Sequence, residues 1–241
     1  MIAFKEEISR MNARLKKKIM DIYNAEAMRY DYTRAFYEKG YGGEREKEIL
    51  ISHCIGTLIL DLACGTGRLL GPFISRRSEV VGIDLSRSML LIAKMKVPEA
   101  HLILGDVENL PFREFMFNCI VCSRALRYFE SLEQALREAY RSLWKGGKIA
   151  LSFESQDPLW VRLFCRLGVL DPFHFRYRIK EIRHLLFEQG FNVIHEGCIF
   201  YFGVAIYERM PKFLVRFLKL FDRSARYGRN EIIIGMKLPR I

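Results

Sequence analysis

The chain reads LILDLACGTGR over Leu58–Arg68, and this stretch decides how the fold is interpreted. The apolar run Thr57–Asp61 ends in an acid and is followed by Gly65 and Gly67. A helical pattern starts at Arg68, so the stretch predicts a strand, a tight turn and a helix. Glycines let the backbone approach a ligand without a Cβ atom in the way. The N–H groups that open the helix favour an anionic group, so we expect a nucleotide-like ligand with a carboxylate here.

Two other ligand classes use glycine-rich turns, and the spacing in this chain disfavours both. A dinucleotide fingerprint reads G-x-G-x-x-G, whereas this turn reads A-x-G-x-G and has Leu70 where the third glycine would stand. A phosphate-binding loop needs Gly-Lys followed by Ser or Thr, and that run does not occur at Gly67. The turn therefore predicts neither a nicotinamide oxidoreductase nor a phosphate loop.

Outward from this turn, the hydrophobic pattern alternates between strand and helix. Helices are expected over residues 1–22, 31–39, 44–52, 86–96, 132–143 and 179–189. Further strands are expected over residues 79–84, 100–104, 117–122, 148–153, 191–202 and 231–238. Apolar strands that alternate with helices predict an α/β fold, in which a mostly parallel sheet is covered by helices on both faces. The long insertion 203–228 favours an antiparallel last strand.

Acidic residues end the first three strands at regular spacing. Asp84 follows Asp61 by 23 residues, and Asp106 follows Asp84 by 22. An acid after the second strand can accept hydrogen bonds from both ribose hydroxyls, and an acid after the third can accept one from an adenine amino group. Each aspartate alone could instead cap a helix. Because the carboxyl ends of parallel strands share one edge, the regular order predicts a joint nucleoside site, with Ser123 beside it.

The same residues resemble the class I S-adenosylmethionine-dependent methyltransferases, over about residues 44–154. The family's D-x-G-C-G-T-G run reads here as Asp61–Gly67, with Ala63 in place of a glycine. The family's ribose-binding acid matches Asp84, and its adenine-contacting acid matches Asp106. The resemblance implies S-adenosylmethionine as the cofactor.

The resemblance also implies a Rossmann-like sheet of seven strands, the last two over residues 192–202 and 231–238. The turn Trp144–Lys148 before the fifth strand resembles the family's L-x-P-G-G, with a lysine in place of the proline. The residues expected to bind the cofactor are Asp61, Ala63, Cys64, Gly65, Gly67, Asp84, Leu85, Met89, Asp106, Val107 and Ser123.

The segments that flank this core carry the substrate in the family that the chain resembles. Asp31–Tyr32 and Phe36–Tyr37 look like the substrate-admitting segment of small-molecule methyltransferases, the quinone-biosynthesis types included. After the fourth strand those relatives show a Leu-His-His-like run, whereas this chain has Ala125–Phe129, so the catalytic residue is left unassigned. The residues expected to face the substrate are Tyr32, Tyr37, Arg124, Arg127 and Tyr128, the first two as lid groups. The alternatives are core packing for the tyrosines and a surface role for the arginines.

These observations predict methyl transfer from S-adenosylmethionine to a small molecule by in-line displacement. One interpretation of the sequence is that this acceptor is apolar or lipid-like. Positioning can remove up to about 7–11 kcal/mol of such a barrier, so a dedicated catalytic residue is not required. The basic flanks leave a tRNA methyltransferase open. Against it, the chain lacks a separate RNA-binding domain and the N-P-P-Tyr/Phe run of amino-directed nucleic-acid enzymes. A non-catalytic S-adenosylmethionine-binding protein is the third interpretation.

The composition is that of a globular chain, with 50% hydrophobic and 28% charged residues. No run of 18 apolar residues occurs, so no membrane-spanning helix is expected. We interpret residues 1–241 as one methyltransferase domain. Its parts are a helical cap over 1–43, a cofactor-binding core over 44–154 and a substrate-side, sheet-completing part over 155–241.

The net charge of +11 is unevenly distributed, because the basic excess lies in residues 1–20, 159–183 and 209–229. Such segments suit an anionic partner or form an ordinary solvated surface. Over 211–229, aromatic and basic residues interleave at helical spacing. This segment could associate peripherally with an anionic membrane surface, or it could cover the sheet edge as a normal core helix. Nucleic acid is the less favoured partner.

The six cysteines are expected to be free thiols in a reducing cytoplasm. Cys119 and Cys122 form a C-x-x-C, but residues three apart on a strand point to opposite faces and cannot pair. No histidine joins them at metal-ligand spacing, so no metal site is predicted. The first 20 residues lack the apolar run of a secretory signal, which also favours a cytoplasmic location.

Overall fold

The computed structural model describes the backbone of residues 2–38, 41–155, 177–199 and 230–238, and of the single residues 166, 211 and 213. Side chains are described within these ranges from residue 14 onward, except at residues 15, 35–38 and 41. The insertion 203–228 and the segment 211–229 therefore lie outside the described residues, apart from residues 211 and 213.

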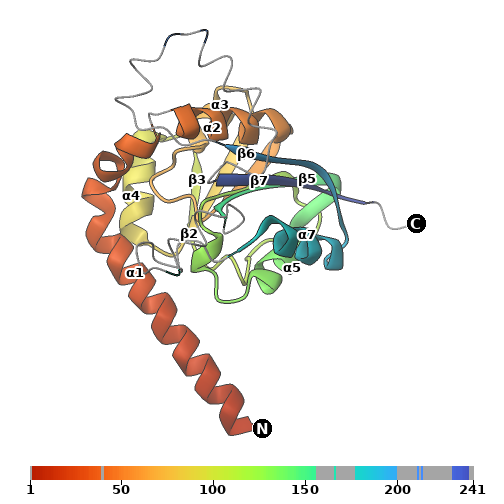
Figure 1. Cartoon of the computed structure of the whole chain (residues 1–241). Coiled ribbons are helices and arrows are strands. Elements are labelled where there is room, and N and C mark those ends of the chain that lie inside the picture. Colours follow the sequence, from red (N-terminus) through yellow and green to blue (C-terminus); the bar gives the residue numbers. More distant parts are fainter. Residues whose placement is uncertain are drawn as a thin grey trace.

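Seven strands form one sheet in the order β3-β2-β1-β4-β5-β7-β6 (Figure 1). They are β1 (Leu58–Leu62), β2 (Glu79–Asp84), β3 (His101–Leu104), β4 (Phe117–Ser123), β5 (Leu143–Glu154), β6 (Phe191–Ile199) and β7 (Asn230–Lys237). Neighbours among β1 to β5 are parallel, whereas β7 runs antiparallel to both β5 and β6. The predicted Rossmann-like class and antiparallel last strand are confirmed. The strand order reverses between β1 and β4, the point at which open α/β sheets bind ligands.

Helices cover both faces of the sheet, because successive strand side chains point to opposite sides (Figure 1). They are α1 (Ile2–Glu38), α2 (Tyr41–His53), α3 (Leu70–Ile74), α4 (Arg87–Lys96), η1 (Leu126–Tyr128), α5 (Leu132–Ser142) and α7 (Ile179–Glu188). Leu60 of β1 joins the core that α5 and α7 cover. Its neighbour Ile59 joins the opposite core, which α2, α3 and α4 cover. The predicted three-layer arrangement is thus built from two buried clusters.

One helix, α1, runs without a break where the sequence pattern predicts two. Residues 23–30 contain neither glycine nor proline, so nothing in that interval ends the helix. Helix α2 begins at Tyr41 and includes Gly42 and Gly43, which the pattern assigns to a break. Glycine disfavours a helix interior but does not forbid the first turn, where most backbone N–H groups have no helical partner in any case.

Strand β5 begins at Leu143, ahead of the predicted start at Lys148. Phe117 pairs with Leu143, but Cys119 pairs with Lys148, so extra residues bulge from β5 between these two pairs. Gly146, inside this irregularity, has a φ of 76°. The run that resembles the family's turn is therefore a bulge within the strand, which sequence periodicity alone does not distinguish from a turn.

The cysteines require a correction, because Cys54 and Cys119 form a disulfide with a Cα–Cα distance of 5.4 Å. A sequence separation of 65 residues hides this pairing, which arises where the end of α2 packs on β4. Cys119 and Cys122 lie in opposite core clusters, so the C-x-x-C does not pair, as predicted. Cys64 and Cys122 are buried free thiols, Cys198 is buried, and Cys165 lies outside the described residues.

Peptide mass spectrometry after alkylation without reductant is expected to find Cys54 linked to Cys119. A bridge that closes a loop of this length stabilises a protein by about 2–4 kcal/mol, largely by constraining the unfolded chain. Reduction should therefore lower the free energy of unfolding of the wild type and leave a Cys54→Ser, Cys119→Ser double variant unchanged. Recovery of both cysteines as alkylated thiols from unreduced protein would contradict the assignment.

Candidate active site

A cavity opens at the carboxyl edge of the parallel strands, between the strand ends and α1. It encloses about 1190 Å³ including the part open to solvent. Among the predicted cofactor-binding residues, all but Gly67 line it, namely Asp61, Ala63, Cys64, Gly65, Asp84, Leu85, Met89, Asp106, Val107 and Ser123.

The glycine-rich turn after β1 leaves its inner side open to this cavity. Ala63, Gly65 and Gly67 have positive φ angles of 53°, 54° and 82°, which glycine adopts without steric penalty. A Cβ atom added to Gly65 would meet nothing within 4 Å, so the space beside it is free for a ligand. A Cβ atom at Gly67 would lie 3.2 Å from the Cβ of Ala93 on α4. Gly65 therefore faces the cavity, whereas Gly67 lets the turn pack against α4.

Asp84 ends β2 with its carboxylate held in a fixed orientation. It accepts hydrogen bonds from the backbone N–H groups of Gly65 and Ser86, both at 2.8 Å. Burial nevertheless raises the pKa of Asp84 above its usual value, against the effect of these bonds. A carboxylate that is oriented from behind and lines a cavity can accept further hydrogen bonds from ligand hydroxyl groups.

Asp61, one residue before the end of β1, is a buried carboxyl group without a hydrogen-bonding partner among the described residues. It is 3% exposed, and it has no side-chain hydrogen bond or ion pair to any residue in the described ranges. Burial raises its pKa to about 8, an effect that Arg68 opposes and Asp84 reinforces. A buried, unpaired acid that lines a cavity is a site for a cationic or hydrogen-bond-donating ligand group.

Helix α1 closes one end of the cavity. Its Asn24 side chain accepts hydrogen bonds from the Ser86 hydroxyl at 2.7 Å and the Ser88 N–H at 3.1 Å, which fixes α1 over the start of α4. Lys16 then donates to Asp106 at 2.6 Å and to Glu108 at 3.1 Å. The earlier part of α1 extends beyond the domain (Figure 1). The predicted adenine-contacting acid is thus engaged by a lysine far away in the sequence.

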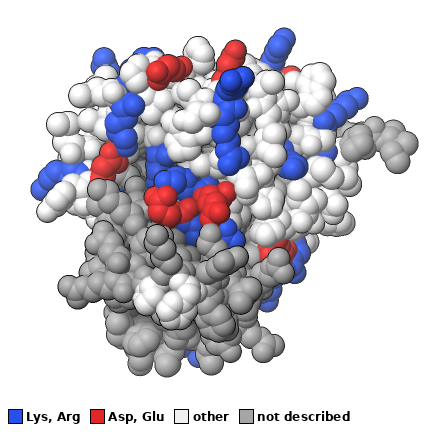
Figure 2. Space-filling view, turned by 90° about the horizontal axis from the view of Figure 1, so that it is seen from above, with Lys and Arg blue, Asp and Glu red and all other residues white. Residues whose placement is uncertain are grey.

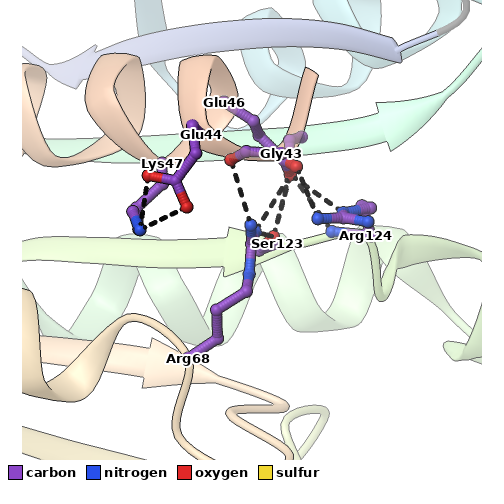
Figure 3. Close-up of polar contacts among 8 residues, drawn as sticks. Gly43, Glu44, Glu46, Lys47, Arg68, Ser123 and Arg124 are labelled. Carbon is purple, nitrogen blue, oxygen red and sulfur yellow. Dashed lines mark hydrogen bonds and ion pairs between the residues drawn. The ribbon is translucent and has the colours of Figure 1, made fainter. Parts of the chain in front are cut away.

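A buried carboxylate from α2 organises the end of β4 (Figure 3). Glu46 is fully buried and forms ion pairs with Arg124 at 2.8 Å and Arg68 at 3.3 Å. It also accepts hydrogen bonds from the hydroxyls of Ser123 and Ser152. Burial alone would raise the pKa of Glu46, but the two arginines and two serines hold it at about 2. Ser123 and Arg124, predicted as ligand-contacting, are therefore positioned by an acid that the sequence analysis does not single out.

The opposite end of the cavity is lined by a group that we call the acceptor cluster, comprising Tyr23, Tyr30, Arg34, Arg127, Tyr128 and Glu154. Arg127 donates to the Glu154 carboxylate at 3.0 Å and to the Tyr128 hydroxyl at 2.8 Å. The rings of Tyr23 and Tyr128 meet edge to face, with centroids 5.3 Å apart. Three of the predicted substrate residues, Arg124, Arg127 and Tyr128, thus line the cavity. They do so together with α1 residues that no sequence pattern marks.

Of the two predicted lid tyrosines, Tyr32 does not line this cavity. Tyr32 is 86% exposed and is not among the residues that line it. On a helix that continues through this region, Tyr30 and Arg34 face inward, which turns Tyr32 toward solvent. The neighbouring Asp31 instead accepts hydrogen bonds from Thr66 at 2.5 Å and Lys96 at 2.7 Å. The side chain of Tyr37 lies outside the described residues.

Comparison with known proteins agrees with this geometry. The model of the family "Methyltransferase domain" matches residues 60–151, which contain the glycine-rich turn and all three strand-end acids. This chain carries a methyltransferase domain over these residues. The methyltransferase domain contains the residues on which the sequence resemblance rests, namely the glycine-rich turn and the strand-end acids.

Relatives of the methyltransferase domain include two demethylmenaquinone methyltransferases. That of Paenarthrobacter aurescens is 35% identical over 112 residues, which are 46% of this chain and 44% of the relative. That of Thermotoga maritima is 30% identical over 146 residues, 58% of this chain and 63% of the relative. The chain thus spans about half the length of the curated relatives it matches.

Solved structures resemble this chain over about nine-tenths of its length at low sequence identity. An S-adenosylmethionine-dependent methyltransferase of Thermotoga maritima is 21% identical with a TM-score of 0.70, covering 90% of this chain and 99% of that one. Magnesium protoporphyrin IX methyltransferase of Synechocystis, solved with bound S-adenosylhomocysteine, is 17% identical with a TM-score of 0.66, covering 92% and 99%. The likeness therefore extends beyond the matched domain to the flanking elements.

Proposed function

We propose that this protein transfers the methyl group of S-adenosylmethionine to a small, lipid-like acceptor of the quinone type. The observation that carries the proposal is that one cavity joins two unlike ends. At one end the acids Asp61 and Asp84 adjoin a glycine-rich turn, and at the other lies the acceptor cluster. The names of the demethylmenaquinone methyltransferase relatives support the type of acceptor.

The residues at the first end fit the functional groups of the cofactor. Asp84, oriented by two backbone N–H groups, would accept from the ribose hydroxyls. Asp61, which has no partner in the described part of the chain, would pair with the ammonium group of the amino-acid moiety. Asp106 would accept from the adenine amino group while Lys16 continues to hold it. The apolar walls for the adenine ring would be Leu85, Met89 and Val107.

The protein's own contribution to the reaction is alignment. When bound, S-adenosylmethionine supplies a methyl group, which an acceptor atom takes by in-line displacement while the electron pair of the broken bond stays on sulfur. Alignment of the reacting atoms can provide up to about 7–11 kcal/mol. Helix α1 contributes to both ends of the cavity, with Lys16 at one and Arg34 at the other. It therefore excludes water and fixes the distance between the two ligands.

The alternative of an RNA substrate finds less support. Among the described residues on the face shown in Figure 2, basic side chains lie among acidic and uncharged ones, and near the centre they gather around acidic side chains. A continuous basic surface is what nucleic-acid binding requires.

No helix in the described ranges is long and apolar enough to cross a membrane. Peripheral membrane association through residues 211–229 remains a prediction. A cytoplasmic location also remains a prediction, but the disulfide between Cys54 and Cys119 removes the argument for it from free cysteines.

Isothermal titration calorimetry with S-adenosylmethionine and S-adenosylhomocysteine tests the cofactor assignment. Transfer of radiolabelled methyl to chemically reduced demethylmenaquinone, whose hydroquinone ring can supply the electron pair, tests the acceptor. Asp84→Ala removes a charge-assisted hydrogen bond of about 1.5–3 kcal/mol, so cofactor affinity should fall roughly 10- to 150-fold. Glu79→Gln, at the exposed start of the same strand, is the matched control and should bind as the wild type does. Equal affinity in all three proteins would refute the ribose assignment.

A further inference from the structure

Arg34 brings a cation to the acceptor end of the cavity, where no carboxylate among the described residues forms a hydrogen bond or ion pair with it. It lines the cavity from α1, and its guanidinium carbon lies 5.3 Å from the centre of the Tyr30 ring. Among the described residues, this ring is the group that Arg34 contacts directly, and its other interactions are longer-range electrostatic ones with Tyr23, Tyr128 and Glu154. By contrast, Arg127 beside it is held by Glu154 at 3.0 Å.

The surroundings of Arg34 belong to the acceptor cluster and not to the cofactor end. Burial alone would lower the pKa of Arg34, but Tyr30, Tyr23, Tyr128 and Glu154 keep it above its usual value. The guanidinium is therefore a permanent cation in a partly desolvated site. A charge in such a place attracts an anion more strongly than it would in water.

We propose that Arg34 binds an oxygen anion of the methyl acceptor, so that the enzyme favours aromatic acceptors with an ionisable hydroxyl group. This inference rests on the proposed function and names the feature of the acceptor that the site selects. A nearby cation lowers the pKa of a bound hydroxyl. The proton leaves to solvent before transfer. The oxygen anion, or the ring carbon that it activates, then supplies the electron pair of the new bond to the methyl carbon, and the electron pair of the broken carbon–sulfur bond stays on sulfur. Where the ring carbon attacks, its hydrogen then leaves as a proton to solvent and the ring regains its aromatic form. The edges and faces of Tyr23 and Tyr128 would contact the acceptor ring.

The carboxylate of the cofactor is a second source of an oxygen anion, and the position of Arg34 argues against it. Arg68 lies on the glycine-rich turn side of the cavity and donates to Ser123 at the end of β4. Arg68 is thus nearer to the residues that fit the cofactor. Arg34 instead interacts with Glu154 at the end of β5. Binding measurements with each ligand separate the two sources.

The test measures binding of 4-nitrophenolate and of nitrobenzene, its neutral analogue without the hydroxyl, to protein saturated with S-adenosylhomocysteine. The wild type should prefer the anion by at least about tenfold, since a charge-assisted contact contributes roughly 1.5–3 kcal/mol. The preference should disappear in Arg34→Gln and partly return in Arg34→Lys. Arg29→Gln, an exposed arginine on the same helix, is the matched control and should keep it. Visible absorbance reports the ionised probe directly, and the apparent pKa of bound 4-nitrophenol should rise when Arg34 is replaced.

A second pair of ligands assigns the anion to its source. S-Adenosylhomocysteine carries the amino-acid carboxylate, whereas 5′-methylthioadenosine lacks it. If Arg34→Gln binds each of these two ligands with the same affinity as the wild type does, the proposal is supported and the variant is shown to be folded. Selective loss of S-adenosylhomocysteine binding in Arg34→Gln would overturn it, as would an unchanged preference for 4-nitrophenolate. Failure of the wild type to bind S-adenosylhomocysteine would instead defeat the proposed function itself.

Discussion

Glu46→Gln is expected to lower the free energy of unfolding by about 3–5 kcal/mol, because it leaves two arginines beside a buried site without their counter-charge. Urea denaturation measures this change. Glu44→Gln, two residues away on α2, removes only an exposed pair with Lys47 and should change stability by less than about 1 kcal/mol. A similar, small loss in both variants would contradict the role given to Glu46.

The same carboxylate predicts a dependence of stability on pH. Its pKa is lowered in the folded protein from 4.5 to about 2, so its contribution is present above the unfolded value and is lost as pH falls through this interval. Glu46→Gln should therefore flatten the acid side of the stability profile. A Glu46→Gln, Arg124→Gln double variant should recover part of the lost stability, because one of the two stranded charges is removed with its partner.

Glu46 also shows why part of the site could not be predicted from the sequence. The strand-end acids were predictable, because each follows an apolar run at a regular interval and parallel strands bring their ends to one edge. Glu46 stands in the run GEREKE, which has the composition of a solvated helix face. Only the packing of α2 over the ends of β4 and β5 turns this one acid inward. No periodicity within α2 marks it.

Helix α1 gives a second example of the same limit. The sequence pattern correctly predicts helix near both ends of this region, but it does not specify that the two segments join. Continuity decides which side chains face the cavity. It directs Tyr30 and Arg34 inward and Tyr32 outward, and it brings Lys16 to Asp106. The cofactor end, built from strand ends, was therefore better predicted than the acceptor end, built in part from a helix that crosses them.

Asp61→Asn is expected to weaken S-adenosylmethionine binding by about thirtyfold or more, while it stabilises the protein without ligand. Loss of one partner of a buried charge pair costs about 2–5 kcal/mol of binding free energy, and asparagine cannot replace the charge that faces the ammonium group. In the ligand-free protein the same carboxyl group has no partner in the described ranges, so its ionisation opposes folding. Calorimetry and thermal unfolding should thus respond in opposite directions.

The pH dependence follows from the raised pKa of Asp61. The folded pKa of about 8 lies above the unfolded value of 3.8, so the folded protein binds the proton more tightly and wild-type stability declines as pH rises between these values. Asp61→Asn removes this decline, and its stability advantage should grow with pH up to about 8. Cofactor binding requires the ionised form and should release a proton, so wild-type affinity should increase from neutral pH toward 8 while the variant's stays flat. A flat profile in the wild type would show that Asp61 is already ionised or does not meet the ammonium group. In that case the Asp61 carboxyl group would lower the stability of the ligand-free protein without contributing to cofactor binding.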